Sequence, residues 1–313
     1  MSTRIRIGTR GSLLAWTQSS WVKAQIETRF PDLTVELVKI VTKGDKIQDV
    51  PLAMVGGKGL FVKEIEDALV RGEVDLAVHS MKDVPTVLPA ELHLGVVTQR
   101  EDPRDVFVAS RCQSLAELPA GARVGTSSLR RRAQLVHLRP DLTVENLRGN
   151  LDTRLRKLAE GAFDAVVVAA AGLRRLGMID RATAFFSPVE MLPAIGQGAL
   201  GLELRRADDW LLSRLGFLNH EETAVAVRAE RAFLARLEGG CQVPIGAHGE
   251  VAAGQVTLTG LVAAVDGSRL VKRARTAPAA EAEALGWDLA GEILDAGGRE
   301  ILEAVYGRSM EGA

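Results

Sequence analysis

The most reactive side chain of the sequence is the thiol of Cys241, in the segment Leu237-Glu-Gly-Gly-Cys-Gln-Val-Pro-Ile-Gly246. Two glycines precede this cysteine, and glycine lets the backbone adopt conformations closed to other residues and approach a ligand closely. Pro244 and Gly246 follow, so a helix cannot continue through the segment. The sequence therefore predicts a tight loop that presents one thiol, directly after a helix that ends near Leu237.

A thiol on such a loop can be a nucleophile, a metal ligand, a covalent tether or a small buried apolar group, and free cysteines are often buried. A cysteine hydrolase would need a histidine base, for which His248 is the only candidate nearby in sequence, and no triad is visible. The five histidines show no metal-ligand spacing with each other or with Cys241. These observations predict no metal site and leave the nucleophile, the tether and the buried group open.

A second candidate is the pair Lys82 and Asp83. Residues 74–80 form an apolar run typical of a buried strand, and Met81-Lys-Asp-Val-Pro85 follows at its carboxyl end. In open α/β sheets, ligands bind at the carboxyl ends of strands. The pair is therefore either a site acid beside a site cation or a surface ion pair of little energetic value.

Two similar segments have the composition of an anion-binding turn. Gly8-Thr-Arg-Gly-Ser12 follows a short predicted strand, and Ser12 is a good N-cap for the helical pattern after it. Arg123-Val-Gly-Thr126, a predicted strand, is likewise followed by serines and a helix to about Leu138. Helix N-termini present free N–H groups and a positive dipole end to anions. Either each turn binds an anion or it is an ordinary strand-to-helix connection; the repetition suggests two halves built alike.

Residues 121–180 are rich in arginine, with eleven Lys/Arg against six Asp/Glu. Several of these arginines fall at predicted strand-to-helix loops, and the planar guanidinium binds carboxylates and phosphates through two bonds at once. A pocket for a ligand with several anionic groups is one interpretation, and a solvated basic face is the other. A nucleic-acid surface is not favoured, because no aromatic residues interleave with the basic ones.

The remaining pattern predicts how these residues are positioned. Strands and helices alternate up to about residue 200, which is typical of α/β domains, with an aperiodic, Gly- and Lys-rich loop at residues 42–59. After a helix at residues 221–237, a hairpin with Asp266-Gly267 at its turn is followed by two helices, as in a small α+β domain. A chain of 313 residues is long for one core, so two or three domains are expected.

Composition narrows the class of protein. Hydrophobic residues make up 47% and charged residues 25%, and the net charge of −1 argues against a polyanion-binding molecule. Two cysteines cannot form a disulfide framework, the first residues contain no apolar signal core, and no apolar run approaches the length of a membrane span. We expect a cytoplasmic protein that binds neither nucleic acid nor membrane.

Seven segments together resemble the porphobilinogen deaminase (hydroxymethylbilane synthase) family. They follow the family's order through nearly the whole chain, and several are long and distinctive: residues 56–61 (GGKGLF), 79–85 (HSMKDVP), 100–105 (REDPRD), 125–131 (GTSSLRR), 147–150 (LRGN), 193–198 (PAIGQG) and 237–246 (LEGGCQVPIG). One position departs, because Met54 stands where members often have a lysine, which puts the charge of that loop in doubt.

The resemblance implies a fold and a domain division. It implies two doubly wound α/β domains similar to type II periplasmic binding proteins, with the chain crossing between them twice, and a small C-terminal α+β domain. The implied ranges are 1–99 with 200–218 for domain 1, 100–199 for domain 2, and 219–313 for domain 3. A two-domain fold of this kind alone would also fit an anion-binding transport module without catalysis.

The resemblance also implies a chemistry and a cofactor. Members are transferases of heme and tetrapyrrole biosynthesis that join four porphobilinogen molecules head to tail, with loss of ammonia, into hydroxymethylbilane. The product grows on a dipyrromethane cofactor, which the resemblance places in thioether linkage to Cys241. Each pyrrole unit carries two carboxylates, which is why an arginine-rich cleft suits the growing chain. A monomer is expected.

Residue roles follow from the motif matches. Asp83 is the expected catalytic residue. The expected cofactor-binding residues are Cys241, Lys82, Ser80, Thr126, Ser128, Arg130, Arg131 and Gly172. The expected substrate-binding residues are Arg10, Ser12, Gln18, Lys58, Arg148, Arg154, Arg175 and Gln197.

Overall fold

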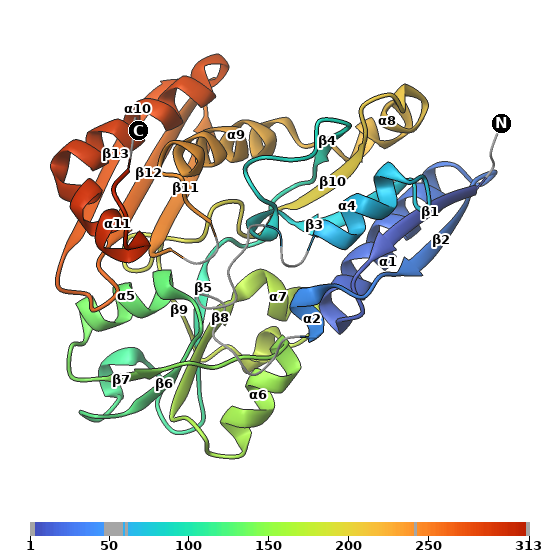
Figure 1. Ribbon diagram of the computed structural model, residues 1–313. Coiled ribbons are helices and arrows are strands. Elements are labelled where there is room, and N and C mark those ends of the chain that lie inside the picture. The colour runs from blue at the N-terminus through green and yellow to red at the C-terminus, as the bar shows by residue number, and fades with distance from the viewer. Residues whose placement is uncertain (1–3, 47–58, 60–61, 241–242, 311–313) are drawn as a thin grey trace. The chain divides into compact units, whose positions relative to one another are not determined.

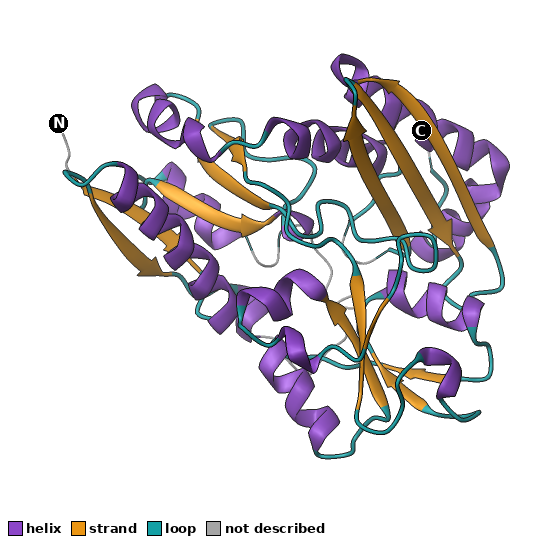
Figure 2. Cartoon of the chain, turned by 180° about the vertical axis from the view of Figure 1, so that it is seen from behind, coloured by secondary structure: helices purple, strands orange, loops and turns teal. Residues whose placement is uncertain are grey.

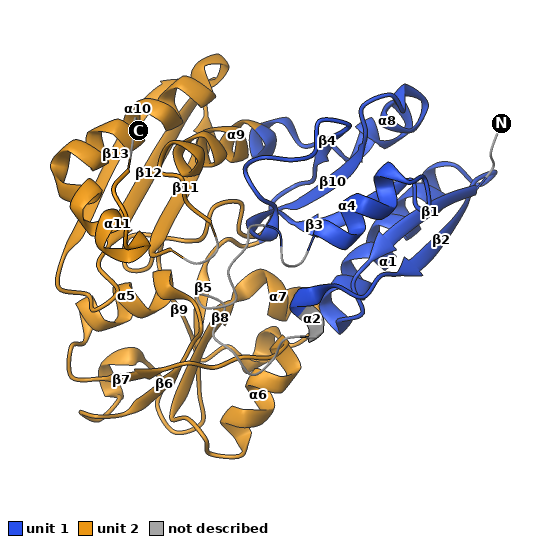
Figure 3. Ribbon diagram, in the orientation of Figure 1, with its two compact units in different colours: residues 1–50, 56–101, 199–224 blue, residues 51–55, 102–198, 225–313 orange. Residues whose placement is uncertain are grey.

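The computed structural model describes residues 4–46, 59, 62–240 and 243–310. The chain divides into two compact units, each of which is discontinuous in sequence (Figure 3). The first consists of residues 1–50, 56–101 and 199–224, and the second of residues 51–55, 102–198 and 225–313. The described residues contain three sheets: one of five strands in the first unit, and one of five and one of three strands in the second.

The sheet of the first unit has the order β2-β1-β3-β10-β4 (Figure 1). Strands β1, β2 and β3 run parallel, whereas β10 runs antiparallel to both β3 and β4. The strand bounds are Arg4–Thr9 for β1, Thr34–Lys39 for β2, Leu76–Ser80 for β3, Leu92–Val97 for β4 and Leu200–Arg205 for β10. The helices of this unit include α1 (Leu13–Arg29), α2 (Lys43–Lys46), α4 (Lys63–Val70) and α8 (Asp209–Leu215).

The alternation of side chains along β3 explains how the two main helices cover this sheet. Leu76 and Val78 share a core with Val22 and Ile26 of α1, while Ala77 lies in a separate core with apolar residues of α4. Successive side chains of a strand point to opposite faces, so α1 and α4 cover opposite faces of the sheet. His79, two residues beyond Ala77, therefore points to the face that α4 covers.

The five-stranded sheet of the second unit repeats this plan, with the order β7-β6-β8-β5-β9. Three neighbouring strands are again parallel, and β5 runs antiparallel to β8, as β10 does to β3. The bounds are Asp105–Ala109 for β5, Arg123–Gly125 for β6, Thr143–Glu145 for β7, Ala165–Ala169 for β8 and Ala184–Phe185 for β9, with helices α5 (Leu129–Leu138), α6 (Leu151–Ala159) and α7 (Ala170–Arg175). The similarity between the two halves that the sequence suggested is thus present in the strand order.

The three-stranded sheet is antiparallel, with the order β11-β12-β13 (Figure 2). Its strands are β11 (Ile245–Ala252), β12 (Gln255–Ala263) and β13 (Leu270–Pro278), and its helices are α9 (Glu221–Arg236), α10 (Ala282–Ile293) and α11 (Arg299–Tyr306). One core joins these elements, with Phe233 of α9, Leu258 of β12 and Leu289 of α10 fully buried in it. The predicted hairpin is confirmed, with Asp266 and Gly267 between its strands.

The fold class expected from the sequence is confirmed: two α/β sheet-and-helix arrays and a small C-terminal α+β array. Strands β4 and β11 and helix α8 were not predicted. Helix α2 occupies the start of the predicted loop at 42–59, most of which lies outside the described residues. The proposed three-domain boundaries stay a prediction.

Candidate functional site

In the first unit, a short turn at the carboxyl end of β3 presents Lys82 and Asp83. The turn is a 3₁₀ helix from Met81 to Asp83, in which Met81 is buried and the other two side chains are partly exposed. The Met81 N–H donates to the carbonyl of Ala199 over 3.0 Å. The Met81 side chain packs against Gly201, where a Cβ would lie 2.3 Å from its sulfur, so a larger residue there would force this side chain to move. The apolar anchor therefore fixes the two charged neighbours at the strand end.

Four expected binding residues lie near the ends of β1 and β3 or on α1: Arg10, Ser12, Gln18 and Ser80. Ser12 is the N-cap of α1, as predicted, and its hydroxyl accepts from the Ala15 N–H over 3.3 Å. Gln18 is buried on α1 and donates from Nε2 to the Ser80 hydroxyl over 3.0 Å. The fold thus joins Gln18 to Ser80, although they are far apart in the sequence, while Arg10 lies partly buried in the loop before Ser12.

A buried cluster of titratable groups lies on the face of β3 that α4 covers. His79 Nε2 lies 2.8 Å from Glu203 Oε2, and both side chains are almost fully buried. Glu203 stands opposite Ala77 in the β3–β10 register, which brings it to the same face. Glu66 of α4 is also buried, and burial, together with the charge of Glu203, raises its pKa to about 7. Among the described residues, neither Glu66 Oε1 nor Glu203 Oε1 has a hydrogen-bond partner.

We expect Glu66→Gln to stabilise the protein at alkaline pH. The pKa of Glu66 is about 7 in the folded protein, against an ordinary value of 4.5 for a glutamate. The folded protein therefore binds a proton more tightly than the unfolded chain, and its stability falls as the pH rises through this range. Glutamine carries no charge and escapes this cost. The free energy of unfolding of Glu66→Gln, measured with urea, should exceed that of the wild type by about 2 kcal/mol at pH 8 and approach it near pH 5.

The matched control is Glu91→Gln, which removes an exposed carboxylate from the same unit. Its effect on stability should be small and should show no comparable dependence on pH. A constant difference between Glu66→Gln and wild type from pH 5 to pH 8 would contradict the raised pKa of Glu66.

In the second unit, the end of β6 and the start of α5 form the predicted turn. The Thr126 N–H donates to the carbonyl of Glu145, and the Thr126 hydroxyl accepts from the Ser128 N–H over 3.2 Å. Ser128 is the N-cap of α5, and its hydroxyl accepts from the Arg131 N–H over 3.4 Å. Both hydroxyls therefore hold the turn that starts the helix.

Arg130 and Arg131, in the first turn of α5, share one buried carboxylate, that of Asp105. Arg130 Nη1 lies 2.7 Å from Asp105 Oδ2, and Arg131 Nη2 lies 2.7 Å from Oδ1. Arg131 Nη1 also donates to the carbonyl of Val167, and Arg130 Nη1 to that of Leu192. The three side chains together keep one net positive charge, and the two guanidiniums are nearly buried.

Asp105 also receives a hydrogen bond from Gln197, whose Nε2 lies 2.9 Å from Asp105 Oδ1 and 2.6 Å from the Pro103 carbonyl oxygen. Burial alone would raise the pKa of Asp105, but the charges of Arg130 and Arg131 hold it well below its usual range. The sequence interpretation gave Asp105 no role. The sequence did hold an indication of this role: Asp105 is a carboxylate at the start of an apolar strand. When such a strand is buried, its carboxylate must be paired.

The other expected residues of this unit lie in helices α6 and α7 or in the loop before α6. Arg154 of α6 donates from Nε to the carbonyl of Gly149 over 2.9 Å, and Gly149 has a φ of 116° that a side chain would strain. Arg175 at the end of α7 donates to the carbonyl of Gly198 over 2.6 Å. Gly172 is buried within α7, and Arg148 is partly buried between β7 and α6.

The basic cluster at residues 121–180 is not a single surface. Three of its arginines form exposed or partly exposed ion pairs with nearby carboxylates, and such pairs contribute little to stability. These pairs are Arg123 with Glu145, Arg139 with Asp141, and Arg156 with Glu160. The expected binding residues Arg130 and Arg131 are instead buried, so the interpretation of a solvated basic face does not apply to them.

Three residues named in the sequence interpretation, Lys58, Cys241 and Met54, lie outside the described residues. The second cysteine, Cys112, is partly buried, and its Sγ lies 3.7 Å from the carbonyl oxygen of Glu117. Within the described part of the chain, no three His, Cys, Asp or Glu side chains cluster so as to hold a metal ion. No described helix is long and apolar enough to span a membrane.

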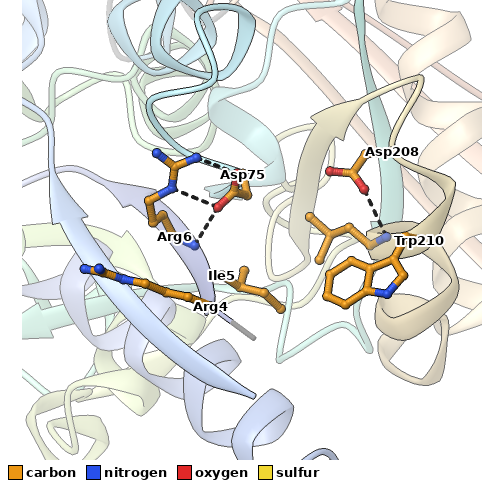
Figure 4. A pocket seen from close by; sticks show the side chains of 7 residues that line it. Arg4, Ile5, Arg6, Asp75, Asp208 and Trp210 are labelled. Carbon is orange, nitrogen blue, oxygen red and sulfur yellow. Dashed lines mark hydrogen bonds and ion pairs between the residues drawn. The ribbon is translucent and has the colours of Figure 1, made fainter. Parts of the chain in front are cut away.

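One cavity of the first unit lies apart from the candidate site. A cavity of about 530 Å³ is lined by Ile5, Arg6, Asp75 and Trp210, among others (Figure 4). Arg6 donates hydrogen bonds of 2.8 to 3.0 Å to the Asp75 carboxylate there, from its backbone N–H and its guanidinium. Asp75 precedes β3, whereas Asp83 follows it, so this cavity lies at the amino end of the strand, away from the candidate site.

Two α/β sheets with cationic and hydroxyl side chains at their strand ends are an arrangement typical of proteins that bind anionic ligands. Two family models assign the chain further: "Porphobilinogen deaminase, dipyromethane cofactor binding domain" matches residues 5–213, and "Porphobilinogen deaminase, C-terminal domain" matches residues 224–295. The chain belongs to the porphobilinogen deaminase family. It is 58% identical over 308 residues to the porphobilinogen deaminase of Geobacter sulfurreducens (98% of this chain, 96% of the relative). It is 57% identical over 302 residues to that of Syntrophobacter fumaroxidans (96% and 98%).

Similar solved structures include a putative methionine-binding lipoprotein from Bacillus subtilis, with a TM-score of 0.43 and 12% identity over 70% of this chain and 90% of that one. A nutrient-binding protein from Burkholderia cenocepacia bound to methionine has a TM-score of 0.43 and 14% identity over 68% and 90%. The full-length match to named deaminases does not favour the alternative of a transport module without catalysis.

Proposed function

We propose that this chain condenses four porphobilinogen molecules into hydroxymethylbilane, with Asp83 as the catalytic residue and Cys241 as the point of cofactor attachment. The observation that carries the proposal is the coincidence of two facts. The family match covers both parts of the chain, and Lys82 and Asp83 stand on an anchored turn at the carboxyl end of β3. In α/β sheets that is the edge where ligands bind.

The described residues have the donor groups that a dipyrromethane would need. Its acetate and propionate groups are anionic, and Lys82, the Ser80 hydroxyl and the cationic cluster of Arg130, Arg131 and Asp105 offer a positive charge and hydrogen-bond donors. When bound, the cofactor would supply the pyrrole carbon to which the first of the four units is joined. Thr126, Ser128 and Gly172 would complete its binding site.

Asp83 supplies the charge that the reaction requires. Loss of ammonia from porphobilinogen leaves a cationic methylene-pyrrole, and a fixed carboxylate beside it stabilises the positive charge as it develops. The same carboxylate can accept a proton from a reacting pyrrole. The anchoring of Met81 keeps the carboxylate in place, so little free energy is spent on orienting it during the reaction.

The remaining cations would bind the carboxylates of substrate and product. We assign this role to Arg148, Arg154 and Arg175, whose guanidiniums stand at the ends of strands or helices of the second unit. Arg10, Ser12 and Gln18 in the first unit, together with Lys58 and Gln197, would have the same role. We also propose a cytoplasmic monomer without nucleic-acid partners, which the low cysteine content and the near-neutral net charge support.

The proposal is tested with Asp83→Asn, which preserves shape and removes the charge. Intact mass should show two extra pyrrole units on wild type and variant alike, because attachment does not depend on this carboxylate. Turnover should fall by about 10²-fold or more, the loss typical of a missing electrostatic or acid–base group. A wild type without the adduct and without product would overturn the assigned activity, whereas a fully active Asp83→Asn would overturn only the role of Asp83.

The matched comparison is Arg148→Leu, which removes a binding cation. This variant should raise KM or halt the product at a particular chain length, read as a covalent intermediate by mass, rather than lower the rate of every step equally.

A further inference from the structure

The helix that precedes the cysteine loop ends in an unusual way. The Gly239 N–H donates to the carbonyl of Leu234, and the Glu238 N–H to that of Ala235, each over 3.0 Å. These two bonds define a Schellman motif, in which the residue before the last donor adopts a left-handed conformation. Here that residue is Glu238, with a φ of 53°. Glycine usually occupies this position, because a side chain makes it unfavourable.

Non-glycine residues with positive φ are rare, and only two occur in the described part of the chain, Glu238 and Ala253. Ala253 lies with Gly254 between β11 and β12, in a hairpin turn that demands such angles. Glu238 instead holds the position of the Schellman motif that glycine usually occupies, and two residues separate it from Cys241. An unfavourable conformation next to a functional residue persists only where neighbouring groups hold it in place.

The C-terminal segment provides those groups. The Tyr306 hydroxyl donates to the carbonyl of Leu237 over 2.9 Å, and Arg308 Nη2 lies 2.5 Å from Glu238 Oε2. The Arg308 guanidinium also lies 5.5 Å from the centre of the Tyr306 ring. Burial, together with the charge of Glu238, raises the pKa of Tyr306 to about 12, so its hydroxyl remains a donor at neutral pH.

The segment is itself anchored at its far end. Gly307 ends α11 in a left-handed conformation and turns the chain back. The Met310 side chain is buried in the same core as Leu237. The Met310 N–H donates to Glu303 over 3.0 Å, and its carbonyl accepts from Arg299 over 3.4 Å. Residues 306–310 therefore form a fixed strap rather than a free end, and the strap contacts the last two residues before the Gly-Gly pair.

We propose that Tyr306 and Arg308 are positioning residues that hold Leu237 and Glu238, and thereby fix where the cysteine loop leaves α9. The inference rests on the proposed role of Cys241 as the attachment point. A cofactor held by one flexible side chain needs a fixed backbone at its base, because misplacement of a reacting group by about 1 Å can cost 10²-fold in rate. The strap acts on the backbone before the thiol, through Leu237 and Glu238.

The sharpest test is Tyr306→Phe, which removes a single hydrogen bond and leaves the ring in place. In the purified holoenzyme, hydrogen–deuterium exchange at the amides of residues 237–239 should accelerate about tenfold, as expected when a restraint of that strength is lost. The kcat should fall about fivefold to thirtyfold with KM nearly unchanged, since the cations that bind substrate are untouched. Arg308→Ala should show the same pattern more weakly, and Arg308→Lys should restore part of it.

The matched control is Ala253→Gly, which relieves the other left-handed residue far along the chain from the cysteine. It should raise the thermal midpoint and leave exchange at residues 237–239, kcat and KM unchanged. Unchanged exchange and kcat in Tyr306→Phe, in an enzyme that carries its cofactor, would overturn the strap. If the wild type carried no adduct and Tyr306→Phe still exchanged faster at residues 237–239, the strap would be supported and the proposed attachment at Cys241 would be overturned.

Discussion

Replacing Cys241 with alanine is expected to yield a folded protein that carries no dipyrromethane and makes no product. A thioether needs the sulfur, and the sequence contains only one other cysteine, Cys112. Without the tether, the growing chain would dissociate between additions, so binding by the arginines cannot rescue turnover. Intact mass should show the bare polypeptide, and assays with porphobilinogen should show activity at background level.

The control is Cys112→Ala. Cys112 is partly buried, makes one weak contact through its sulfur to Glu117, and belongs to none of the family-like segments. This variant should keep both the adduct and the full rate. If Cys241→Ala retained the adduct, or if Cys112→Ala lost it, the cofactor would not be attached to Cys241.

Much of the fold could be predicted from local sequence. The strand at Asp105–Ala109 and the helix ending at Leu138 have the bounds that their patterns indicated, and Ser12 caps α1 as expected. Strand β11 escaped prediction because it begins directly after Pro244 and contains Gly246 and Gly249, which normally weaken strands. Those glycines are required by packing: a Cβ on Gly249 would lie 3.2 Å from Ala226.

The candidate site was predictable where one segment carries the chemistry, as in the turn with Lys82 and Asp83. It was not predictable where distant segments meet. The bond between Gln18 and Ser80, the contact of Tyr306 with Leu237 and the pairing of Asp105 with two arginines depend on tertiary structure alone. Motif reading therefore assigned Arg130 and Arg131 to the ligand without the carboxylate that they share.

The carboxylate of Asp105, which Arg130 and Arg131 share, is expected to have the second large effect, on stability. We expect Asp105→Asn to lose about 3–5 kcal/mol of stability, because removing one partner of a buried ion pair leaves the other charges uncompensated. Two guanidiniums would then be buried with one carboxamide oxygen between them. Urea unfolding at pH 7 measures the loss. Because the pKa of Asp105 is lowered by folding, its contribution is present above its ordinary pKa of 3.8 and lost as the pH falls further.

Cofactor occupancy in Asp105→Asn distinguishes a role in binding from a purely structural buried ion pair. If Arg130 and Arg131 hold the cofactor, as the family resemblance implies, then their displacement should lower the fraction of protein that carries the dipyrromethane mass, even in molecules that remain folded. Asp141→Asn is the matched control, since Asp141 is an exposed residue of the same unit that pairs with the partly exposed Arg139, and this variant should change neither the urea midpoint nor the adduct. A destabilised Asp105→Asn with full cofactor occupancy would mean that the cluster only supports the fold. Loss of both would mean that one buried carboxylate positions the two arginines for binding and stabilises the domain at the same time.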